Sequence, residues 1–576
     1  MKNYLFITIC CFSMFSFAQN ETTKSKFGTL SGGFESNSQW YNNDKQRGIS
    51  HPEKAFRSNN YLLLNYNYKN FTVGIQGEAY EPNALLNFNP KYHKTNVATY
   101  YANYKSSRLD ITAGYFYEQF GSGLLLRSWE DRSLGINNAL RGGKITYTPT
   151  ENLLFTALYG KQRTGFDVTN GEIYGFNSNI NLFKMMDITS SNLTIGLSFV
   201  ARGEKLLLDN PSFDRQTNAF RGSIDFTKNN FYISGEYNFK AKDAIVYNIN
   251  KINNNFVKPG SAILINTGYS KKGFAIDLNL RRIENMSFYS QRIPDTYTET
   301  LSSSINFNDK MVNFVPSLTK QHHFNLANIY VYQAQSQVLI DPDTGVTKAG
   351  EIGGQIDLFY DFKKNSTLGG KYGTKVAINL SNWNNLKADY VLYPPDYKTD
   401  LLGFGEKYFS DYNIEVTKRV SPRATYNFAY INQYYNNRLI TGAARVKVKT
   451  NIVAIEGDYK FSKGRAAKVA LEHLWTETDR RNWAAILIEY NFNTKFSVFA
   501  SDMYNYGYKH DPTILIDDVT DPFDIHFYNV GGAYKIGSAR IAINYGRQRG
   551  GLVCAGGVCR MVPPSSGLGI SLTKSF

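Results

Sequence analysis

Long hydrophobic runs are missing from nearly all of this 576-residue chain. After the first nineteen residues no stretch approaches 18 consecutive apolar residues, and the mean hydropathy is −0.38. A membrane-spanning helix needs about 20 predominantly apolar residues. The chain therefore cannot cross a membrane as a helix, and a closed β-barrel is the one membrane-spanning architecture left to it.

Proline, cysteine and histidine are all scarce, with 16, 4 and 7 residues. The histidines are scattered, and none has metal-ligand spacing with cysteine or carboxylate neighbours. His322 and His323 point to opposite faces of any strand, so we interpret the pair as structural. Gly121-Ser122-Gly123 lacks the full spacing and the following helix of a nucleophile elbow, and we interpret it as a loop. We expect no enzyme activity, cofactor or metal site.

The first nineteen residues are typical of an export signal. Lys2 gives the positive start, residues 4–17 are an apolar run, and Ala18 and Gln19 mark the expected cleavage region. The run is too short for a membrane anchor, and Cys10 lies inside it, which argues against a lipoprotein. The predicted organisation is a signal peptide over residues 1–19, followed by a single barrel domain over 20–576.

Aromatic residues and glycine are abundant, with 42 Tyr, 39 Phe and 46 Gly. This composition suits strands whose ends lie in two aromatic girdles. Alternation over about ten residues recurs along the chain, for example with Phe71, Val73 and Ile75 on one face and Gln76 and Glu78 on the other. A one-residue slip would place charges in lipid, at up to ~2 to 4 kcal/mol for each cation at the midplane. The alternation therefore fixes the register.

Short turns alternate with longer polar loops, which predicts a large antiparallel transmembrane β-barrel with short periplasmic turns and long extracellular loops. The pattern gives about 26 strands, with a range of 22 to 26, and places both mature termini in the periplasm. The count is weakest over 289–350, where Pro316 and the two adjacent histidines blur the alternation. A soluble sandwich also alternates, but its strands are shorter than ten residues. The final strand stops at Phe576, which resembles the end signal of outer-membrane proteins.

A barrel of this size has a wide lumen that something must fill. Alternation begins by Phe27, which leaves no room for a plug domain before the first strand, so inward loops over 118–141 and 383–408 are the first candidates. Residues 118–141 mix glycine, apolar residues and residues of both charge signs, which suits a loop folded inside a lumen. An ordinary surface loop is the alternative for this segment. Its candidate lumen residues are Glu118, Arg127, Trp129, Glu130, Asp131, Arg132 and Arg141. The candidate lumen-wall residues are Glu78, Glu236, Asp277, Arg281, Asp357, Glu415, Glu456, Asp458 and Arg540.

Cys554 and Cys559 are the two cysteines outside the signal, and export predicts a disulfide between them worth roughly 2 kcal/mol. Free thiols or a metal site are the alternatives. The bond would stiffen a basic segment that includes Arg547, Arg549 and Arg560, suited to a protein partner or lipid headgroups. The chain has a net charge of +16 but no dense Lys/Arg cluster, so we expect no nucleic-acid partner. The expected partners are outer-membrane lipids, including lipopolysaccharide, and envelope proteins.

A family resemblance rests on three features: Phe17-Ala18-Gln19, the tyrosine-rich strands, and the stretch from 119–123 to 139–142. These features resemble a family of uncharacterised outer-membrane proteins from Bacteroidota, over nearly the whole mature chain. The resemblance implies an outer-membrane barrel but no activity and no residue roles.

Two functional hypotheses follow. The first is a channel or transport barrel with a loop-filled lumen, whose mixed-charge wall would hydrate a solute pathway. The second is a structural or accessory subunit of an outer-membrane complex for protein secretion or barrel assembly. Conductance in planar bilayers separates the two.

Overall fold

The computed structural model describes residues 27–86, 88, 91–204, 214–247, 251–292, 310–441, 447–507, 524–555 and 557–576. Twenty-four antiparallel strands form one closed ring, because β1 (Thr29–Tyr41) pairs both with β2 and with the last strand, β32 (Ser565–Ser575). The predicted all-β antiparallel barrel is confirmed, and 24 strands lies within the predicted range. The predicted signal segment, residues 1–19, lies outside the described residues.

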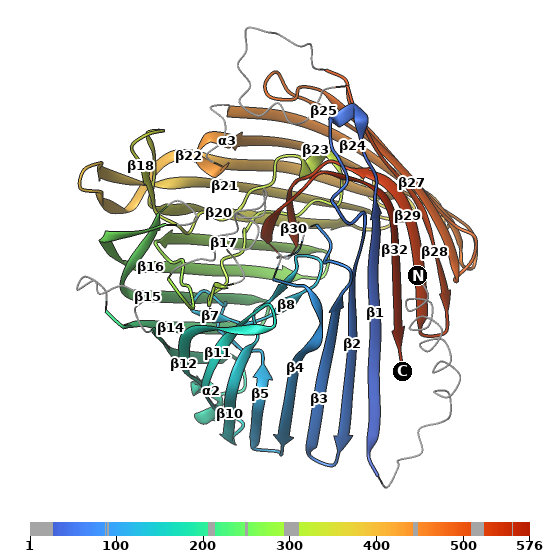
Figure 1. The fold of residues 1–576 in the computed structure, drawn as a ribbon. Coiled ribbons are helices and arrows are strands. Elements are labelled where there is room, and N and C mark those ends of the chain that lie inside the picture. Colours follow the sequence, from blue (N-terminus) through green and yellow to red (C-terminus); the bar gives the residue numbers. More distant parts are fainter. Residues whose placement is uncertain are drawn as a thin grey trace.

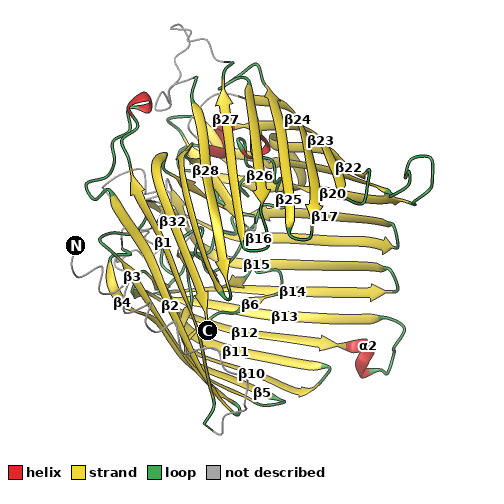
Figure 2. Cartoon of the chain, turned by 90° about the vertical axis from the view of Figure 1, so that its right-hand side faces the viewer, coloured by secondary structure: helices red, strands yellow, loops and turns green. Residues whose placement is uncertain are grey.

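Every strand of the ring pairs with the strand before it and the strand after it, so the ring is a succession of hairpins (Figures 1 and 2). Between β1 and β32 the ring strands are β2 (Phe56–Tyr68), β3 (Phe71–Tyr80), β4 (Lys94–Lys105), β5 (Leu109–Phe116), β10 (Leu140–Thr150), β11 (Leu153–Thr164), β12 (Asp167–Asn181), β13 (Asn192–Gly203), β14 (Gln216–Lys228), β15 (Phe231–Tyr247), β16 (Lys251–Lys271), β17 (Phe274–Glu284), β20 (Gly350–Phe362), β21 (Thr374–Val391), β22 (Asp396–Arg419), β23 (Ala424–Asn436), β24 (Lys447–Ser462), β25 (Arg465–Trp475), β26 (Trp483–Asn491), β27 (Phe496–Asn505), β28 (His526–Ile536) and β29 (Ala539–Gln548).

Short elements lie in the connections. They are β6 (Gln119–Phe120), β7 (Leu126–Arg127), β8 (Glu130–Asp131), β9 (Ile136–Asn137), β18 (Leu339–Asp341), β19 (Val346–Lys348), β30 (Gly551–Ala555), β31 (Val558–Val562), α2 (Leu182–Met185), α3 (Asn437–Thr441), and the 3-10 turns η2 (Lys45–Arg47) and η5 (Leu326–Asn328). Among the residues that the structure describes, no helix is long and apolar enough to span a bilayer.

The ring has fewer than 26 strands because the described parts of residues 285–349 add no strand to it. β17 pairs directly with β20, from Phe274 opposite Tyr360 to Glu284 opposite Gly350. The described part of this segment includes Pro316, which has no N–H to donate to a strand ladder. Polar groups of the segment bond instead to side chains of the strands, as Pro316 does to Arg281 and Lys320 does to Glu415. The weak alternation there therefore marks a loop.

The prediction of an inward loop at 383–408 is wrong. Residues 383–391 end β21 and 396–408 begin β22, and the two runs pair from Trp383 opposite Phe409 to Val391 opposite Asp396. The register shifts three times along this hairpin, which is the mark of β-bulges. The bulges interrupt the strict alternation that identifies a strand in sequence, while the ladder itself continues to the tip.

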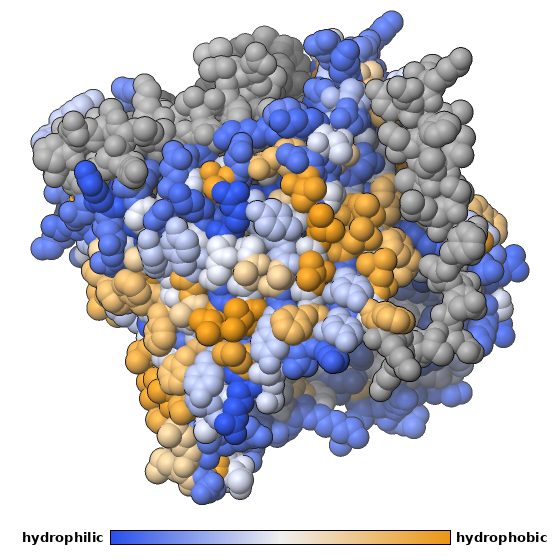
Figure 3. Space-filling model, turned by 60° about the horizontal axis from the view of Figure 1, so that its bottom comes forward, coloured by the Kyte–Doolittle hydropathy of each residue, from blue (hydrophilic) through white to orange (hydrophobic). Residues whose placement is uncertain are grey.

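The two faces of the strands differ in the way the alternation predicts. On β3, Phe71, Val73 and Ile75 are among the exposed large hydrophobic residues, whereas Gln76 and Glu78 are buried. The same division recurs around the ring, and hydrophobic side chains gather on the outer surface with hydrophilic zones on either side (Figure 3). The polar face therefore points into the ring and the apolar face points out.

Substitution on β32 tests this orientation. Ile570→Arg would place a cation on the outward face, and we expect it to lower the free energy of unfolding by ~2 to 4 kcal/mol in lipid. Thr573 lies on the opposite face, across from Glu35, so Thr573→Arg is expected to change stability by about 0.5 kcal/mol or less. Guanidinium unfolding of the lipid-reconstituted variants measures both values, and equal losses would contradict the assigned faces.

Candidate functional site

Three of the connections opposite the tight turns fold back into the ring, and we call them the inner loops (Figure 1). Loop A, residues 117–139, joins β5 to β10. Loop B, residues 285–349, joins β17 to β20. Loop C, residues 549–564, joins β29 to β32. The structure describes all of loop A, residues 285–292 and 310–349 of loop B, and residues 549–555 and 557–564 of loop C.

The turn at Gly121 and Ser122 attaches loop A to the inward face of β15. Ser122 donates from its hydroxyl to Glu236 Oε1 (2.6 Å) and from its backbone N–H to Glu236 Oε2 (3.1 Å). Arg221 on the neighbouring strand holds the same carboxylate from the other side, at 2.8 Å. Gly121 has φ +55°, and a Cβ there would meet Arg221 Nε at 2.0 Å, so the turn needs glycine. The predicted wall residue Glu236 thus receives loop A.

The charged residues predicted in loop A make short ion pairs. Arg132 reaches Glu35 on β1 (2.7 Å) and Glu130 within the loop (3.2 Å). Glu118 pairs with Lys144 on β10, at 3.1 Å. These contacts join loop A to strands on both sides of its own position in the ring.

The remaining predicted residues of loop A have separate roles. Arg127 lies over the rings of Phe314 in loop B (3.8 Å) and Trp129 (4.9 Å), which are cation–π contacts. Asp131 accepts hydrogen bonds from the backbone N–H of Leu134 and the hydroxyl of Ser133, which closes a turn. Arg141 is exposed on β10, opposite Tyr115, and so lies outside the loop.

Loop B converges on one buried carboxylate at the start of β20. Glu351 pairs with Arg281 of β17 (2.5 Å) and accepts hydrogen bonds from the Tyr332 hydroxyl (2.5 Å) and the Gln335 backbone N–H (2.7 Å). Arg281 also donates to the carbonyl oxygen of Pro316, at 2.6 Å. Both side chains are about fully buried. The buried ion pair between β17 and β20 therefore binds two separate segments of loop B, one at Pro316 and one at 332–335.

A row of acids on β22 holds the next part of loop B. Lys320 pairs with Glu415 (2.7 Å) and His322 with Asp411 (2.9 Å); these two acids share the inward face of the strand. His323 lies 3.5 Å from Glu456 on β24, so the adjacent histidines reach different strands. This fits the structural interpretation of the pair.

The η5 turn of loop B begins on a wall carboxylate. Glu472 of β25 accepts hydrogen bonds from the backbone N–H groups of Asn325 (3.0 Å) and Leu326 (2.7 Å). Around the turn, loop B and the wall share an apolar cluster that includes Leu326, Trp383 and Trp483. Loop B is therefore held both by polar contacts and by a hydrophobic core.

Loop C carries the disulfide between Cys554 and Cys559, which joins β30 to β31. Gly557 accepts a hydrogen bond from the Ser317 N–H of loop B (2.7 Å), and Arg560 is buried and donates to the carbonyl oxygens of Ser133 and Leu134 in loop A. Arg560 belongs to the basic segment expected to suit a protein partner or lipid headgroups, and in the structure its guanidinium is engaged by backbone carbonyls of loop A. Loop C links loops A and B.

The predicted wall residues fall into two groups according to what they contact. Glu236, Arg281, Glu415 and Glu456 contact an inner loop directly. The second group contacts other strands or lies near the tight turns. Within it, Glu78 pairs with buried Arg163 (2.6 Å), Asp277 accepts from Tyr232 (2.8 Å), Asp357 accepts from Asn379 (2.6 Å), Asp458 is half-buried and Arg540 is exposed.

Several residues of this site were absent from the predicted set. Asp411, Glu351 and Lys320 carry central contacts. Asp411 was open to prediction, because it alternates with Asn413 and Glu415 on one strand face. Lys320 had no such signal, because a loop has no period.

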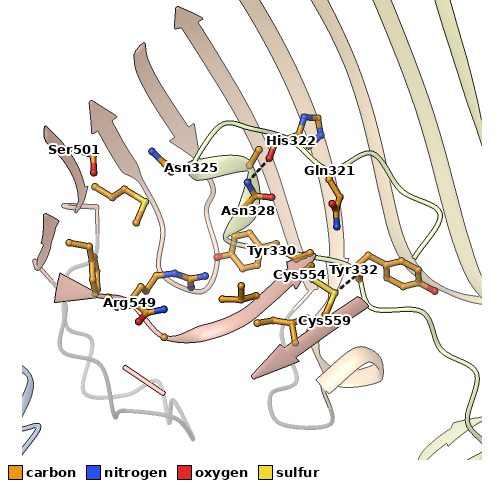
Figure 4. A pocket seen from close by; sticks show the side chains of 18 of the residues that line it. Gln321, His322, Asn325, Asn328, Tyr330, Tyr332, Ser501, Arg549, Cys554 and Cys559 are labelled. Carbon is orange, nitrogen blue, oxygen red and sulfur yellow. Dashed lines mark hydrogen bonds between the residues drawn. A yellow bond between two sulfur atoms is a disulfide. The ribbon is translucent and has the colours of Figure 1, made fainter. Parts of the chain in front are cut away.

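A cavity of about 570 Å³ lies between loop B, loop C and one arc of the wall (Figure 4). Loop B contributes residues between 317 and 332, and loop C contributes the disulfide. The wall side comes from β1, β22, β23, β27, β28, β29 and β32. Among the residues described, no group of three or more His, Cys, Asp or Glu side chains is arranged to hold a metal ion.

The contact of His323 with Glu456 predicts a pH dependence. The hydrogen bond to Glu456 raises the pKa of His323 above its ordinary value. The stabilisation is therefore complete below the ordinary histidine pKa of about 6.5 and is lost as pH rises through the raised value. We expect amide protection factors over 321–329, corrected for intrinsic exchange, to be higher at pH 6 than at pH 9. His323→Gln should remove that difference, and an unchanged difference would assign it to another group.

No curated protein matches the chain. Among solved structures, the siderophore receptor PirA from Pseudomonas aeruginosa aligns with a TM-score of 0.41 and 9% identity, over 96% of this chain and 81% of that one. The P pilus usher (PapC) translocation pore aligns with a TM-score of 0.37 and 8% identity, over 95% of this chain and 99% of that one. The copper transporter OprC aligns with a TM-score of 0.39 and 10% identity, over 96% of this chain and 82% of that one.

A family model described as a family of unknown function, DUF6029, matches residues 1–576. The resemblance to an uncharacterised family is thereby confirmed, while its Bacteroidota origin stays a prediction. The chain belongs to the DUF6029 family of unknown function.

Proposed function

We propose that this protein is an outer-membrane transport barrel whose lumen is closed at rest by the three inner loops. The exposed apolar face of the strands supports the membrane location, because only contact with hydrocarbon makes such a surface favourable around the entire ring. The observation that carries the proposal is the attachment of loop B, whose polar groups meet carboxylates on the inward face of β20, β22 and β25.

The chemistry of these contacts suits a gate. When loop B leaves the wall, the carboxylates of Asp411, Glu415 and Glu472 exchange protein partners for water inside the lumen, so their charges stay solvated. The apolar cluster around Leu326 and Trp383 opposes the movement, because its surface would meet water. The closed state is therefore the ground state, and an open state lies above it by the cost of exposing this cluster.

Cross-linking loop B to the wall tests the proposal. Lys320→Cys with Glu415→Cys would place two thiols where a 2.7 Å ion pair now joins loop B to β22, and a short bismaleimide would then fix the loop. We expect wild-type barrels in planar bilayers to show infrequent openings, and the cross-linked double variant to lose at least about nine-tenths of them. Each single cysteine variant treated with the same reagent is the control.

Two outcomes would contradict transport. Openings that persist at the wild-type frequency after complete cross-linking would place the pathway elsewhere. A wild-type barrel that never conducts and copurifies with envelope proteins in fixed ratio would instead favour the accessory-subunit hypothesis.

A further inference from the structure

The cavity between loops B and C has a composition that is informative about its ligand. Its volume of about 570 Å³ lies inside the range of about 300 to 1,000 Å³ that small-molecule sites occupy. Eight asparagine and glutamine side chains contribute to its lining, from loop B and from strands on the other side. The cavity therefore offers hydrogen-bond donors and acceptors from several directions.

The charged groups at the cavity are largely neutralised by neighbours. Lys320 pairs with Glu415 (2.7 Å), and His322 with Asp411 (2.9 Å). Arg547 pairs with Asp44, at 2.7 Å. A ligand carrying a net charge would compete with these pairs, whereas a neutral ligand leaves them in place.

Several amides at the cavity have unused hydrogen-bonding capacity. Within the described part of the chain, the side-chain amides of Gln39, Gln321 and Asn325 have no protein hydrogen-bond partner, and Gln321 and Asn325 lie on the stretch of loop B beside the cavity (Figure 4). Gln433 is 3% exposed, and its Oε1 has no partner among the described residues. A buried amide oxygen without a partner costs free energy, so the site favours a ligand or water that donates to it.

Aromatic side chains complete the wall. Tyr330, Phe409 and Phe527 line the cavity beside the amides. Sugar rings have apolar C–H faces that pack on aromatic rings and a rim of hydroxyl groups that donate and accept hydrogen bonds. Amides suit such hydroxyl groups, because each carries both a donor and an acceptor.

We propose that this cavity binds a neutral, hydroxyl-rich solute, a short saccharide in chemical class. The inference rests on the proposed transport function, because it names the class of solute that the gate admits. Loop B supplies Gln321 and Asn325 on one side, and the wall supplies Gln39 and Gln433 on the other. Ligand binding and loop position are thereby coupled, since one half of the site belongs to the moving element.

Isothermal titration of the intact barrel in detergent tests the site. The probes are maltotriose, cellotriose and mannotriose as neutral sugars and trigalacturonate as an anionic one. We expect at least one neutral trisaccharide to bind, and Gln39→Leu and Gln321→Leu each to raise its Kd about 3- to 10-fold, the usual effect of one lost hydrogen bond. Gln216→Leu is the matched control, because Gln216 is exposed on β14 and, among the described residues, its side chain bonds to Asn218 alone. Heat-modifiable migration on gels verifies that every variant is folded.

Each other outcome overturns the inference. These outcomes are no binding of any neutral probe, binding of trigalacturonate more tightly than all three, or an equal loss in the Gln216→Leu control. The titration needs no open pore, so it is independent of the conductance test. Conductance without sugar binding removes this site alone, and sugar binding by a barrel that never conducts removes transport alone.

Discussion

Removal of residues 288–334 is expected to turn the closed barrel into an open one, with a mean bilayer conductance at least about tenfold above wild type. The deletion takes out the section of loop B that meets β22, β24 and β25. The structure allows a clean closure, because the Met286 N–H donates to the Ser336 carbonyl oxygen at 3.1 Å, so a Gly-Ser-Gly linker spans the cut. The ring stays intact, since β17 pairs directly with β20.

The control for this deletion shortens an element outside the lumen. Residues 391–395 form the exposed tip of the β21–β22 hairpin, on the same side of the barrel as the inner loops. Replacing them with Asn-Gly shortens this hairpin and leaves all three inner loops unchanged. We expect this variant to conduct as wild type does. Increased sensitivity of cells to large antibiotics should follow the loop B deletion alone. An unchanged conductance after the loop B deletion would show that loop B does not close the lumen.

The second large effect is expected at Glu351. Glu351→Gln leaves Arg281 buried without its counter-ion, which costs about 3 to 5 kcal/mol of folding stability. The same change weakens the attachment of loop B, because Tyr332 and Gln335 lose a charged acceptor. We therefore expect a lower free energy of unfolding together with more frequent openings in planar bilayers.

Glu78→Gln separates these two consequences. Glu78 is as buried as Glu351 and holds Arg163 within the wall at 2.6 Å, so its loss is expected to destabilise the barrel by a similar amount, about 3 to 5 kcal/mol, without added openings. Glu172→Gln breaks a half-exposed pair with Lys161 and should cost about 1 kcal/mol or less. Equal numbers of openings in Glu351→Gln and Glu78→Gln would attribute the conductance to general instability, not to loop B.

The sequence by itself determined the barrel and its register. Strand alternation is a local property with a period of two residues, so Val73 outward and Glu78 inward are readable without any partner strand. The same locality placed Glu236, Glu415 and Glu456 on the inward face, where the structure finds them in contact with inner loops. Cys554 and Cys559 were likewise close enough in sequence to pair.

Only the tertiary structure decided what fills the ring. Asn325 meets Glu472, and Arg560 meets Leu134, across separations of 147 and 426 residues that no local pattern records. Loops have no period, so their direction depends on which wall groups need partners once the ring has closed. For that reason the described parts of residues 285–349 proved to add no strand to the ring, where the sequence left the strand count weakest, and residues 383–408 proved to be strands where a loop was predicted.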